Sequence, residues 1–207
     1  MNAVNTSQKN IELDISSQIV EAAHNRFRHY GYGKTTMAEI AADIGMSAAN
    51  LYRYFKNKQD IIAECANRSM CERLDRLRVA IRKPELSAIE RLKAYVLTDL
   101  VISQEMAEND EKINELVNNI TLQRPDMVYS KIEAENAVIE EILSYGNETG
   151  EFAIDDISNT ANTIHMSLVI FNVPTFMSLY SLEEFGEKAV SVIELIVSGL
   201  AKHNQAI

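Results

Sequence analysis

The chain has 207 residues, enough for one or two domains with a sizeable core, and its lack of Trp, three Pro and seven Gly favour long helices with few connections. The formal net charge of −10 argues at first against a nucleic-acid partner, so the distribution of charge matters. No basic segment followed by an apolar run opens the sequence, and no run approaches the ~18 to 20 apolar residues of a membrane span, so we expect a cytoplasmic protein.

The first expected elements are a polar arm and a helix. Residues 1–13 are polar and offer one basic side chain, Lys9. A helix is predicted over about Asp14–Tyr30, with an inner face of Ile19, Ala22, Ala23 and Phe27. Arg26 and Arg28 lie on other faces, where they could contact phosphate or face solvent.

Residues 35–58 have the spacing of a helix-turn-helix. Four apolar side chains fall at i, i+3, i+4 and i+7 of a short helix: Met37, Ile40, Ala41 and Ile44. Thr36 and Glu39 form a capping-box pattern at its start. Gly45 is expected to end this helix, because glycine readily takes the left-handed conformation that turns the chain.

A second short helix is expected after the turn. Ser47 caps it, and Leu51 and Phe55, four residues apart, point back onto the first helix. The outward positions carry small, hydrogen-bonding or cationic groups: Ala48, Ala49, Asn50, Tyr52, Arg53 and Lys56. Such groups suit a helix in the major groove of DNA. Two short packed helices of any kind can mimic this spacing, but here the caps, the apolar pattern and the outward chemistry agree.

These residues also carry a family resemblance. The segment TTMAEIAADIGMSAANLYRYFKNKQDII resembles the DNA-binding signature of the tetracycline-repressor (TetR) family of bacterial regulators, and LYRYFKNK is its most specific part. The preceding helix resembles the family's first helix, so the similarity covers about residues 16–62. The resemblance implies DNA binding by Thr36, Ser47, Ala48, Ala49, Asn50, Tyr52, Arg53 and Lys58.

The roles implied for these residues differ. Thr36, Tyr52 and Lys58 are expected to contact phosphates, and Arg53 stands where the family often has His. Ala48, Ala49 and Asn50 are expected to face the bases. The family's arm often bears Arg or Lys, whereas this one has only Lys9, so arm contacts with DNA are in doubt.

The charge is unevenly distributed along the chain. Residues 1–58 hold seven Lys and Arg against five acids, a net charge of +2, and residues 59–207 hold 13 bases and 25 acids, a net charge of −12. This asymmetry suggests a DNA-facing end on an acidic body, although +2 is small enough to arise by chance.

The rest of the chain predicts six more helices. The first, about Lys58–Arg82, leaves the DNA-binding part and enters the body. The others are expected at about Glu85–Met106, Asp110–Leu122, Asp126–Tyr145, Asp155–Tyr180 and Leu182–His203. Pro174 should kink or split the helix that contains it. The predicted fold class is all-α with about nine helices: a three-helix DNA-binding domain, residues 1–57, and a helical ligand-binding and dimerisation domain, residues 58–207.

A homodimer is expected through the last two predicted helices. From Ile164 to Leu179 apolar residues occur around most of the helix, and a helix apolar on nearly all sides is buried on nearly all sides. One flank would face its own core and the other a second subunit, which resembles the family's usual four-helix dimer interface. The alternative is a central helix buried within a monomer.

The sequence shows no pattern typical of catalysis. It contains no glycine-rich phosphate loop, no HExxH and no GxSxG, and its four histidines are scattered. Cys65 and Cys71 are about 240° apart on the predicted helix, and no Cys/His cluster offers a metal site. We therefore expect no enzymatic activity, no metal and no cofactor.

The body is expected to hold a small molecule. Its Met, Phe and Tyr residues suit an adaptable apolar pocket, though ordinary core packing uses the same side chains. The family resemblance implies a pocket coupled to DNA release. The candidate ligand contacts are Tyr95, Arg124, Tyr129, His165, Met166, Phe171 and Asn172. Arg124 could hold a carboxylate or phosphate or form a surface ion pair, and His165 could instead be a hydrogen-bonded core residue.

The sequence thus predicts a ligand-responsive, homodimeric transcriptional regulator. It would act as a repressor that binds an inverted-repeat operator in double-stranded DNA and is released by a small, largely apolar molecule. The alternative is an all-helical module whose helix-turn-helix packs against a protein. Salt-dependent, sequence-selective binding to duplex DNA would separate the two.

Overall fold

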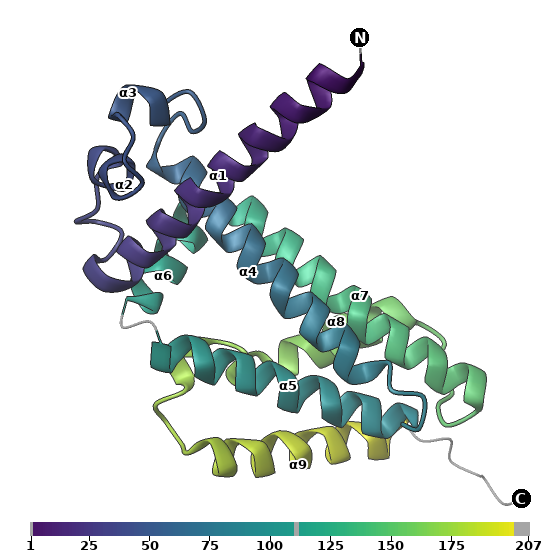
Figure 1. Cartoon of the computed structure of the whole chain (residues 1–207). Coiled ribbons are helices and arrows are strands. Elements are labelled where there is room, and N and C mark those ends of the chain that lie inside the picture. Colours follow the sequence, from purple (N-terminus) through teal and green to yellow (C-terminus); the bar gives the residue numbers. More distant parts are fainter. Residues whose placement is uncertain (1, 110–111, 201–207) are drawn as a thin grey trace, which may run out of the picture. The chain divides into compact units, whose positions relative to one another are not determined.

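The structure, a computed structural model, describes residues 2–109 and 112–200, with side chains for residues 14–108 and 112–200. These residues form nine α-helices and two short 3-10 helices (Figure 1). Their bounds are α1 Asn2–Tyr30, α2 Met37–Asp43, α3 Ala48–Leu51, α4 Lys58–Ile81, α5 Ala88–Asn109, α6 Ile113–Gln123, α7 Pro125–Thr149, α8 Ile157–Ser167, η1 Val169–Phe171, η2 Pro174–Phe176 and α9 Leu182–Leu200. The predicted all-α class is confirmed.

The chain divides into two compact units. The first comprises Met1–Ser69 with Asp110–Met127, and the second Met70–Asn109 with Val128–Ile207. Helix α4 therefore begins in the first unit and ends in the second, and α6 belongs to the first. The boundaries of these units do not fall after residue 57. The expected division into a DNA-binding domain, residues 1–57, and a ligand-binding and dimerisation domain, residues 58–207, stays a prediction about function.

The core of the first unit joins residues from five helices. Its buried members are Ile19, Val20, Ala23, Phe27, Met37, Ile40, Ala41, Leu51, Ile61, Ile62, Cys65 and Leu116. The inner face predicted for α1 holds, with Ala22 only partly buried and Val20 joining it. Burial raises the pKa of the Cys65 thiol to about 12, so this cysteine stays protonated and packs as a small apolar group. Cys71, in contrast, is exposed.

Helix α1 is longer than predicted. It begins at Asn2, whereas the helix was expected to begin at about Asp14, after a polar arm. Residues 2–13 contain neither Gly nor Pro, so no residue in them interrupts a helix that continues from the packed part of α1. The Lys9 side chain lies outside the described side chains.

The second unit is built around α5. Helix α9 lies alongside α5 (Figure 1), and the end of α4, α7 and α8 complete one core. Large side chains that are almost fully buried there include Tyr95, Phe185, Leu77, Ile81, Leu92 and Leu100. Phe185 meets Phe171 and Tyr180 edge to face, with ring centroids 5.6 and 5.1 Å apart. Such aromatic pairs stabilise a packed core beyond the area they bury.

The predicted helix over Asp155–Tyr180 is wrong in its extent. It ends at Ser167, and two 3-10 turns follow. At the end of α8, the Leu168 amide donates to the carbonyls of both Ile164 and His165, each at 3.1 Å, so the helix tightens before Pro174 is reached. Pro174 then begins η2, where its missing N–H leaves no donor unsatisfied. The expected split is present, but it lies upstream of the proline.

The remaining helix bounds differ from expectation by a few residues, as helix ends commonly do. Helix α5 starts and ends three residues later than predicted, and α7 continues to Thr149. The expected bounds at Asp110 and His203 lie outside the described residues. Within the part of the chain that the structure describes, no helix combines the length and apolar character that a membrane crossing requires.

Candidate functional site

The predicted caps of α2 are present. The Thr36 side chain accepts from the Glu39 amide, and the Glu39 carboxylate accepts from the Thr36 amide at 2.8 Å, which completes the capping box. At the other end Gly45 has φ +68, and the amides of Gly45 and Met46 donate back to Ala42 and Ala41. This is the bond pattern of a Schellman motif, so both ends of α2 are fixed by local hydrogen bonds.

Helix α3 is a single regular turn that continues as tight turns. The Ser47 hydroxyl accepts from the Asn50 amide at 3.2 Å and caps it. Leu51 is fully buried and Phe55 is partly buried against the same core, as predicted. After Leu51 the chain makes a mixture of i→i+3 and i→i+4 backbone bonds as far as Phe55. The outward residues therefore sit on a short helical segment with an anchored inner face.

The expected DNA-facing residues share this segment. Ser47, Ala49, Tyr52 and Arg53 are exposed, and Ala48 and Asn50 are partly buried. Tyr52 exposes 52% of its surface, which is high for an aromatic side chain. Thr36 is exposed at the start of α2, but its hydroxyl also donates to Glu39 at 2.8 Å. The structure thus brings the residues from 47 to 53 together.

Lys58 is held by the protein itself. Its ammonium donates to the backbone carbonyls of Tyr32 at 2.5 Å and Thr35 at 2.7 Å, and lies 4.2 Å from the centroid of the Tyr32 ring. Burial lowers the pKa of Lys58, while the charges of Glu115 and Glu39 act in the opposite direction. Lys58, which was expected to contact a DNA phosphate, therefore stabilises the turn between α1 and α2 in this structure.

Helix α6 supports the same turn. Glu115 accepts from the amide of Gly33 at 2.7 Å, and Leu116 is buried in the first unit's core. Gly31 has φ +84, and a Cβ built there would lie 2.6 Å from a Glu115 carboxylate oxygen. Glycine at position 31 therefore permits both the left-handed turn and the close approach of α6.

Arg26 joins α1 to α2 instead of standing free in solvent. Its guanidinium donates to Asp43 through two bonds, one of them 2.9 Å, and lies 3.5 Å from Glu39. The hydrogen bond to Asp43 is the main reason that the pKa of Arg26 is raised and that of Asp43 lowered. The pair orients α2 against α1, a role that the sequence did not indicate.

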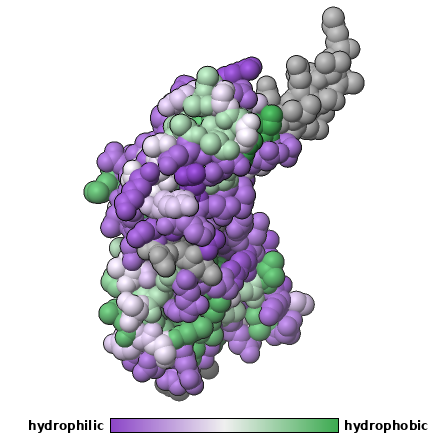
Figure 2. Space-filling view, turned by 60° about the vertical axis from the view of Figure 1, so that its left-hand side comes forward, coloured by the Kyte–Doolittle hydropathy of each residue, from purple (hydrophilic) through white to green (hydrophobic). Residues whose placement is uncertain are grey.

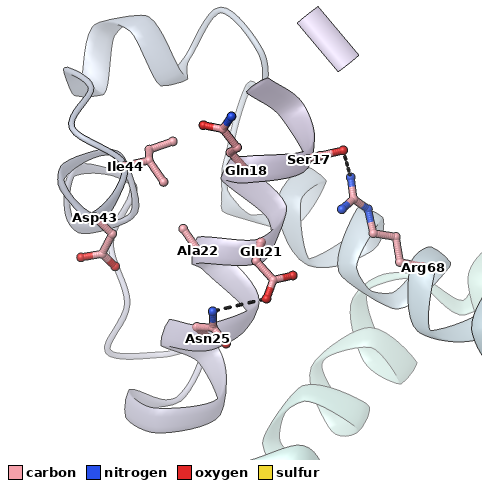
Figure 3. Close-up of a pocket in the computed structure, with 8 residues that line it drawn as sticks. All are labelled: Ser17, Gln18, Glu21, Ala22, Asn25, Asp43, Ile44 and Arg68. Atoms are coloured by element: carbon pink, nitrogen blue, oxygen red, sulfur yellow. Dashed lines mark hydrogen bonds between the residues drawn. The ribbon is translucent and has the colours of Figure 1, made fainter. Parts of the chain in front are cut away.

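An open groove of about 650 Å³ lies between α1 and α2 and reaches Arg68 of α4 (Figure 3). It is lined by Ser17, Gln18, Glu21, Ala22, Asn25, Asp43, Ile44 and Arg68. Arg68 donates to the Ser17 hydroxyl at 3.1 Å, and Asn25 to Glu21 at 3.5 Å. Most of its polar side chains are therefore engaged with one another.

The second unit contains a buried polar cluster, which we define as Arg73, Tyr95, Asp99, Ser103, Glu135 and His165. All six are at least 95% buried. The Arg73 guanidinium donates to Asp99 at 2.7 Å, to the Ser103 hydroxyl at 2.9 Å and to the Asn172 carbonyl at 3.3 Å. Arg73 Nε also lies 3.2 Å from Glu135 Oε1. One buried cation thus sits between two buried carboxylates.

Glu135 has further cationic and polar neighbours. His165 Nε2 and the Lys131 ammonium each lie 2.9 Å from Glu135 Oε2. Burial alone would raise the pKa of Glu135, but the His165 hydrogen bond and the charges of Lys131 and Arg73 outweigh it and bring the value to about 2. For Asp99, burial is the largest effect and raises the pKa. Glu135 is accordingly an ionised acceptor at neutral pH.

The candidate ligand residues separate into two groups. Tyr95, His165 and Phe171 are buried in the second unit, as is Asn172, whose carbonyl bonds Arg73. Arg124, Tyr129 and Met166 lie elsewhere. Arg124 pairs with Asp126 at 2.7 Å, the surface role considered from the sequence, and Tyr129 and Met166 expose 68% and 58% of their surface.

Sequence reasoning missed the charged members of the buried polar cluster. Arg73 and Glu135 lie on the apolar stripes of their helices, four residues before Leu77 and Ile139. Asp99 lies four residues after the buried Tyr95, on the same face of α5. A charged residue among the apolar positions of a helix indicates a buried ion pair, because charged side chains are rarely buried unless paired. Among the described residues, no group of His, Cys, Asp and Glu is arranged to hold a metal ion.

The first unit defines a helix-turn-helix protein of the DNA-binding class. Comparison with protein families agrees: the N-terminal profile of bacterial regulatory proteins of the tetR family matches residues 19–65, and that of the tetracyclin repressor-like C-terminal domain matches residues 88–193. The chain belongs to the TetR family of DNA-binding transcriptional regulators, which are typically ligand-responsive repressors and not enzymes.

Individual relatives extend over nearly the whole chain. The fatty acid metabolism regulator protein of Bacillus subtilis (strain 168) is 24% identical over 203 residues, covering 91% of this chain and 95% of that protein. A transcriptional regulator from Cytophaga hutchinsonii has a similar structure, with a TM-score of 0.68, 23% identity, and coverage of 89% of this chain and 97% of that one. The fatty acid degradation regulator FadR from Bacillus halodurans has a TM-score of 0.64 at 20% identity, covering 86% and 93%.

Proposed function

We propose that this protein is a homodimeric repressor that binds an inverted-repeat operator and leaves it when a small, largely apolar molecule binds the second unit. The observation that carries the proposal is the helix-turn-helix, with α2 capped at both ends and a segment from Ser47 to Arg53 in which Ser47, Ala49, Tyr52 and Arg53 are exposed. Because bacterial DNA lies in the cytoplasm, the proposal places the protein there.

The DNA contacts follow from exposure and chemistry. Tyr52 and Arg53 are exposed and contact phosphates through a hydroxyl and a guanidinium. Ala48, Ala49 and Asn50 face the bases, and the Asn50 amide pairs with adenine. The engaged groups Thr36, Ser47 and Lys58 act mainly by fixing α2, α3 and the turn before α2, and contact phosphate only where a bond to the protein is exchanged.

Exposed apolar side chains support the homodimer. Those on α8, α9 and the chain between them are Met166, Ile170, Leu179, Tyr180, Leu182 and Leu195, each at least 40% exposed. The face drawn in Figure 2 is mostly hydrophilic, with separate hydrophobic patches. In an isologous interface one self-complementary patch serves both subunits. Two DNA-binding units can then occupy half-sites one helical turn apart, about 34–36 Å, or a multiple of it.

The effector is expected to be largely apolar. The second unit offers mostly hydrophobic side chains, and its polar groups are concentrated in the buried polar cluster. A relative similar over 91% of this chain is named for fatty acid metabolism, which concerns largely apolar molecules. Release requires that the effector bind the DNA-free arrangement more tightly than the DNA-bound one. Operator DNA must then weaken effector binding by the same factor.

Two substitutions in the DNA-facing segment should have different effects. Arg53→Gln should weaken binding to all duplexes alike and reduce the slope of log affinity against log salt by about one, because one phosphate contact is lost. Asn50→Ala should instead reduce discrimination at one base pair by about 1–3 kcal/mol. Fluorescence anisotropy with the operator, its single-base variants and a scrambled duplex at several salt concentrations measures both effects.

The matched control is Lys83→Gln, which removes an exposed cation in the second unit and should change neither quantity. Equal, sequence-independent losses for Asn50→Ala and Arg53→Gln would reject the base contact assigned to Asn50. If the unmodified protein shows neither salt dependence nor sequence preference, the helix-turn-helix serves as a protein-docking module instead.

A further inference from the structure

Three polar atoms of the buried polar cluster have no hydrogen-bond partner among the described residues. They are the Tyr95 hydroxyl, Glu135 Oε1 and His165 Nδ1. Such orphaned groups are rare, because a buried donor or acceptor without a partner destabilises the folded state. The three belong to one place: Tyr95 is one turn from Asp99 on α5, the charges of Asp99 and Glu135 both act on its hydroxyl, and His165 bonds Glu135.

The atoms without a partner can be satisfied by a group that donates a hydrogen bond. The two hydrogen-bond donors to Glu135, Lys131 and His165, both reach Oε2. Arg73 Nε lies 3.2 Å from Oε1 as an ion pair but makes no hydrogen bond to it, so Oε1 can still accept one. In the tautomer whose Nε2 donates to Glu135, Nδ1 of His165 is a second acceptor. The Tyr95 hydroxyl can donate or accept. A hydroxyl group on a ligand would match this set, since it donates one proton and accepts another.

The charges of the cluster disfavour an anionic ligand. Arg73 is the buried cation that could have attracted one, but it donates to Asp99, Ser103 and the Asn172 carbonyl and is ion-paired with Glu135. A ligand carboxylate beside Glu135 Oε1 would place two like charges together in a site of low dielectric. Within the cluster the charge of Arg73 opposes those of Asp99 and Glu135, and the partly exposed Lys131, which pairs with Glu135, adds a second positive charge, so no excess positive charge remains to attract a ligand anion.

We propose that the buried polar cluster is the recognition site for a hydroxyl group on an otherwise apolar effector, held by Tyr95, Glu135 and His165. This inference rests on the proposed ligand-responsive function and specifies its ligand: an alcohol or phenol is preferred over a carboxylate or an ether of the same skeleton. Arg124, on α6 and paired with Asp126, takes no part.

Two matched sets of probes test the site on the full-length protein by isothermal titration calorimetry. One set is 1-decanol, decanoate and decyl methyl ether, and the other is 2-naphthol, 2-naphthoate and 2-methoxynaphthalene. In at least one set the hydroxyl compound should bind about tenfold more tightly than its two partners, the factor expected for one additional hydrogen bond. Equal affinities within each set, tighter binding of an acid, or no binding by either hydroxyl compound would overturn the assignment.

Tyr95→Phe should remove the preference for the hydroxyl compound over its ether and leave the ether's affinity unchanged. The control Tyr145→Phe alters a half-buried tyrosine that stacks on Arg91, and should keep the preference. In the absence of ligand, Tyr95→Phe should not lower the Tm, because its hydroxyl has no partner in the described structure. A lower Tm would show that the hydroxyl serves the fold, for instance through a buried water, and would contradict the assignment.

A parallel measurement of operator release separates this inference from the proposed function. If the hydroxyl compound binds with the expected preference but leaves operator affinity unchanged, the recognition site is correct and the ligand response is wrong. If all three members of a set release the operator equally, the ligand response is correct and the recognition site is wrong.

Discussion

Replacing Arg73 by Met is expected to lower the free energy of unfolding by about 3–5 kcal/mol. The substitution keeps a long side chain but leaves the carboxylates of Asp99 and Glu135 buried without the cation between them. Removing one partner of a buried ion network is far more destabilising than removing an exposed pair, because the remaining charge has no solvent to stabilise it. Urea denaturation followed by circular dichroism at one fixed protein concentration measures the effect.

The pH dependence gives the same account a second test. Loss of Arg73 should raise the pKa of Asp99 further above its usual range, because burial already raises it and Arg73 opposes that effect. The folded variant then binds a proton at a pH where the unfolded chain does not. Stability lost at pH 7 should therefore be partly recovered as the pH falls toward 5.

Arg76→Met is the control for Arg73→Met, since Arg76 pairs with Glu105 on the surface of the same unit. It should change stability by about 1 kcal/mol or less. Comparable losses for the two variants, or a loss at Arg73 that does not depend on pH, would contradict the description of the cluster as a buried ion network.

Leu195→Glu is expected to reduce operator affinity by at least about 100-fold while the helix content is preserved. Leu195 is 74% exposed on α9, so a charge there is compatible with the folded subunit but not with a buried dimer interface. A monomer loses the gain in affinity that comes from binding two half-sites together. Sedimentation velocity at micromolar concentration should show dimers for the unmodified protein and monomers for the variant.

Ile193, also on α9, is not a suitable position for testing the interface. It is fully buried in its own subunit, so a charge there would unfold the second unit instead of testing the interface. Leu122→Glu, on α6, alters a leucine that is 78% exposed and should leave both dimerisation and operator affinity unchanged. A Leu195→Glu protein that remains dimeric and binds the operator normally would remove α9 from the proposed interface.

The sequence predicted the elements whose determinants are local. The capping box of Thr36 and Glu39, the turn at Gly45 and the inward Leu51 all depend on residues within a few positions of one another. Short-range hydrogen bonds and helical spacing are sufficient to predict such features. This is why the helix-turn-helix and the all-α class could be predicted before the structure was described.

Features that depend on contacts distant in sequence were not predicted. The bond between Glu115 and Gly33 joins residues 82 positions apart, and α6 consequently belongs with the first unit. Arg26 pairs with Asp43, and Lys58 donates to a backbone carbonyl of the α1–α2 turn. The sequence had suggested that both cations could contact DNA phosphate. The sequence shows that a cationic side chain is present, but tertiary packing determines which group it contacts.

The ligand candidates were predicted only in part for the same reason. Residue type selected Tyr95, His165 and Phe171, which are buried together in the second unit, and also Tyr129 and Met166, which are exposed. Helical periodicity identifies the apolar residues of a buried face and does not indicate the buried charges of Arg73 and Glu135. A charge that falls on an apolar stripe is a stronger indication of a buried polar site than an aromatic residue found there.

The central claim is sequence-specific recognition of an inverted repeat by a dimer. Selection of duplexes from a random library by the unmodified protein, followed by sequencing, tests it most directly. The account predicts enrichment of two inverted half-sites whose centres lie about 10 base pairs apart or a multiple of that spacing, with enrichment lost for Leu195→Glu. A selected pool with no shared motif, or with a single half-site that the Leu195→Glu variant enriches equally, would contradict it.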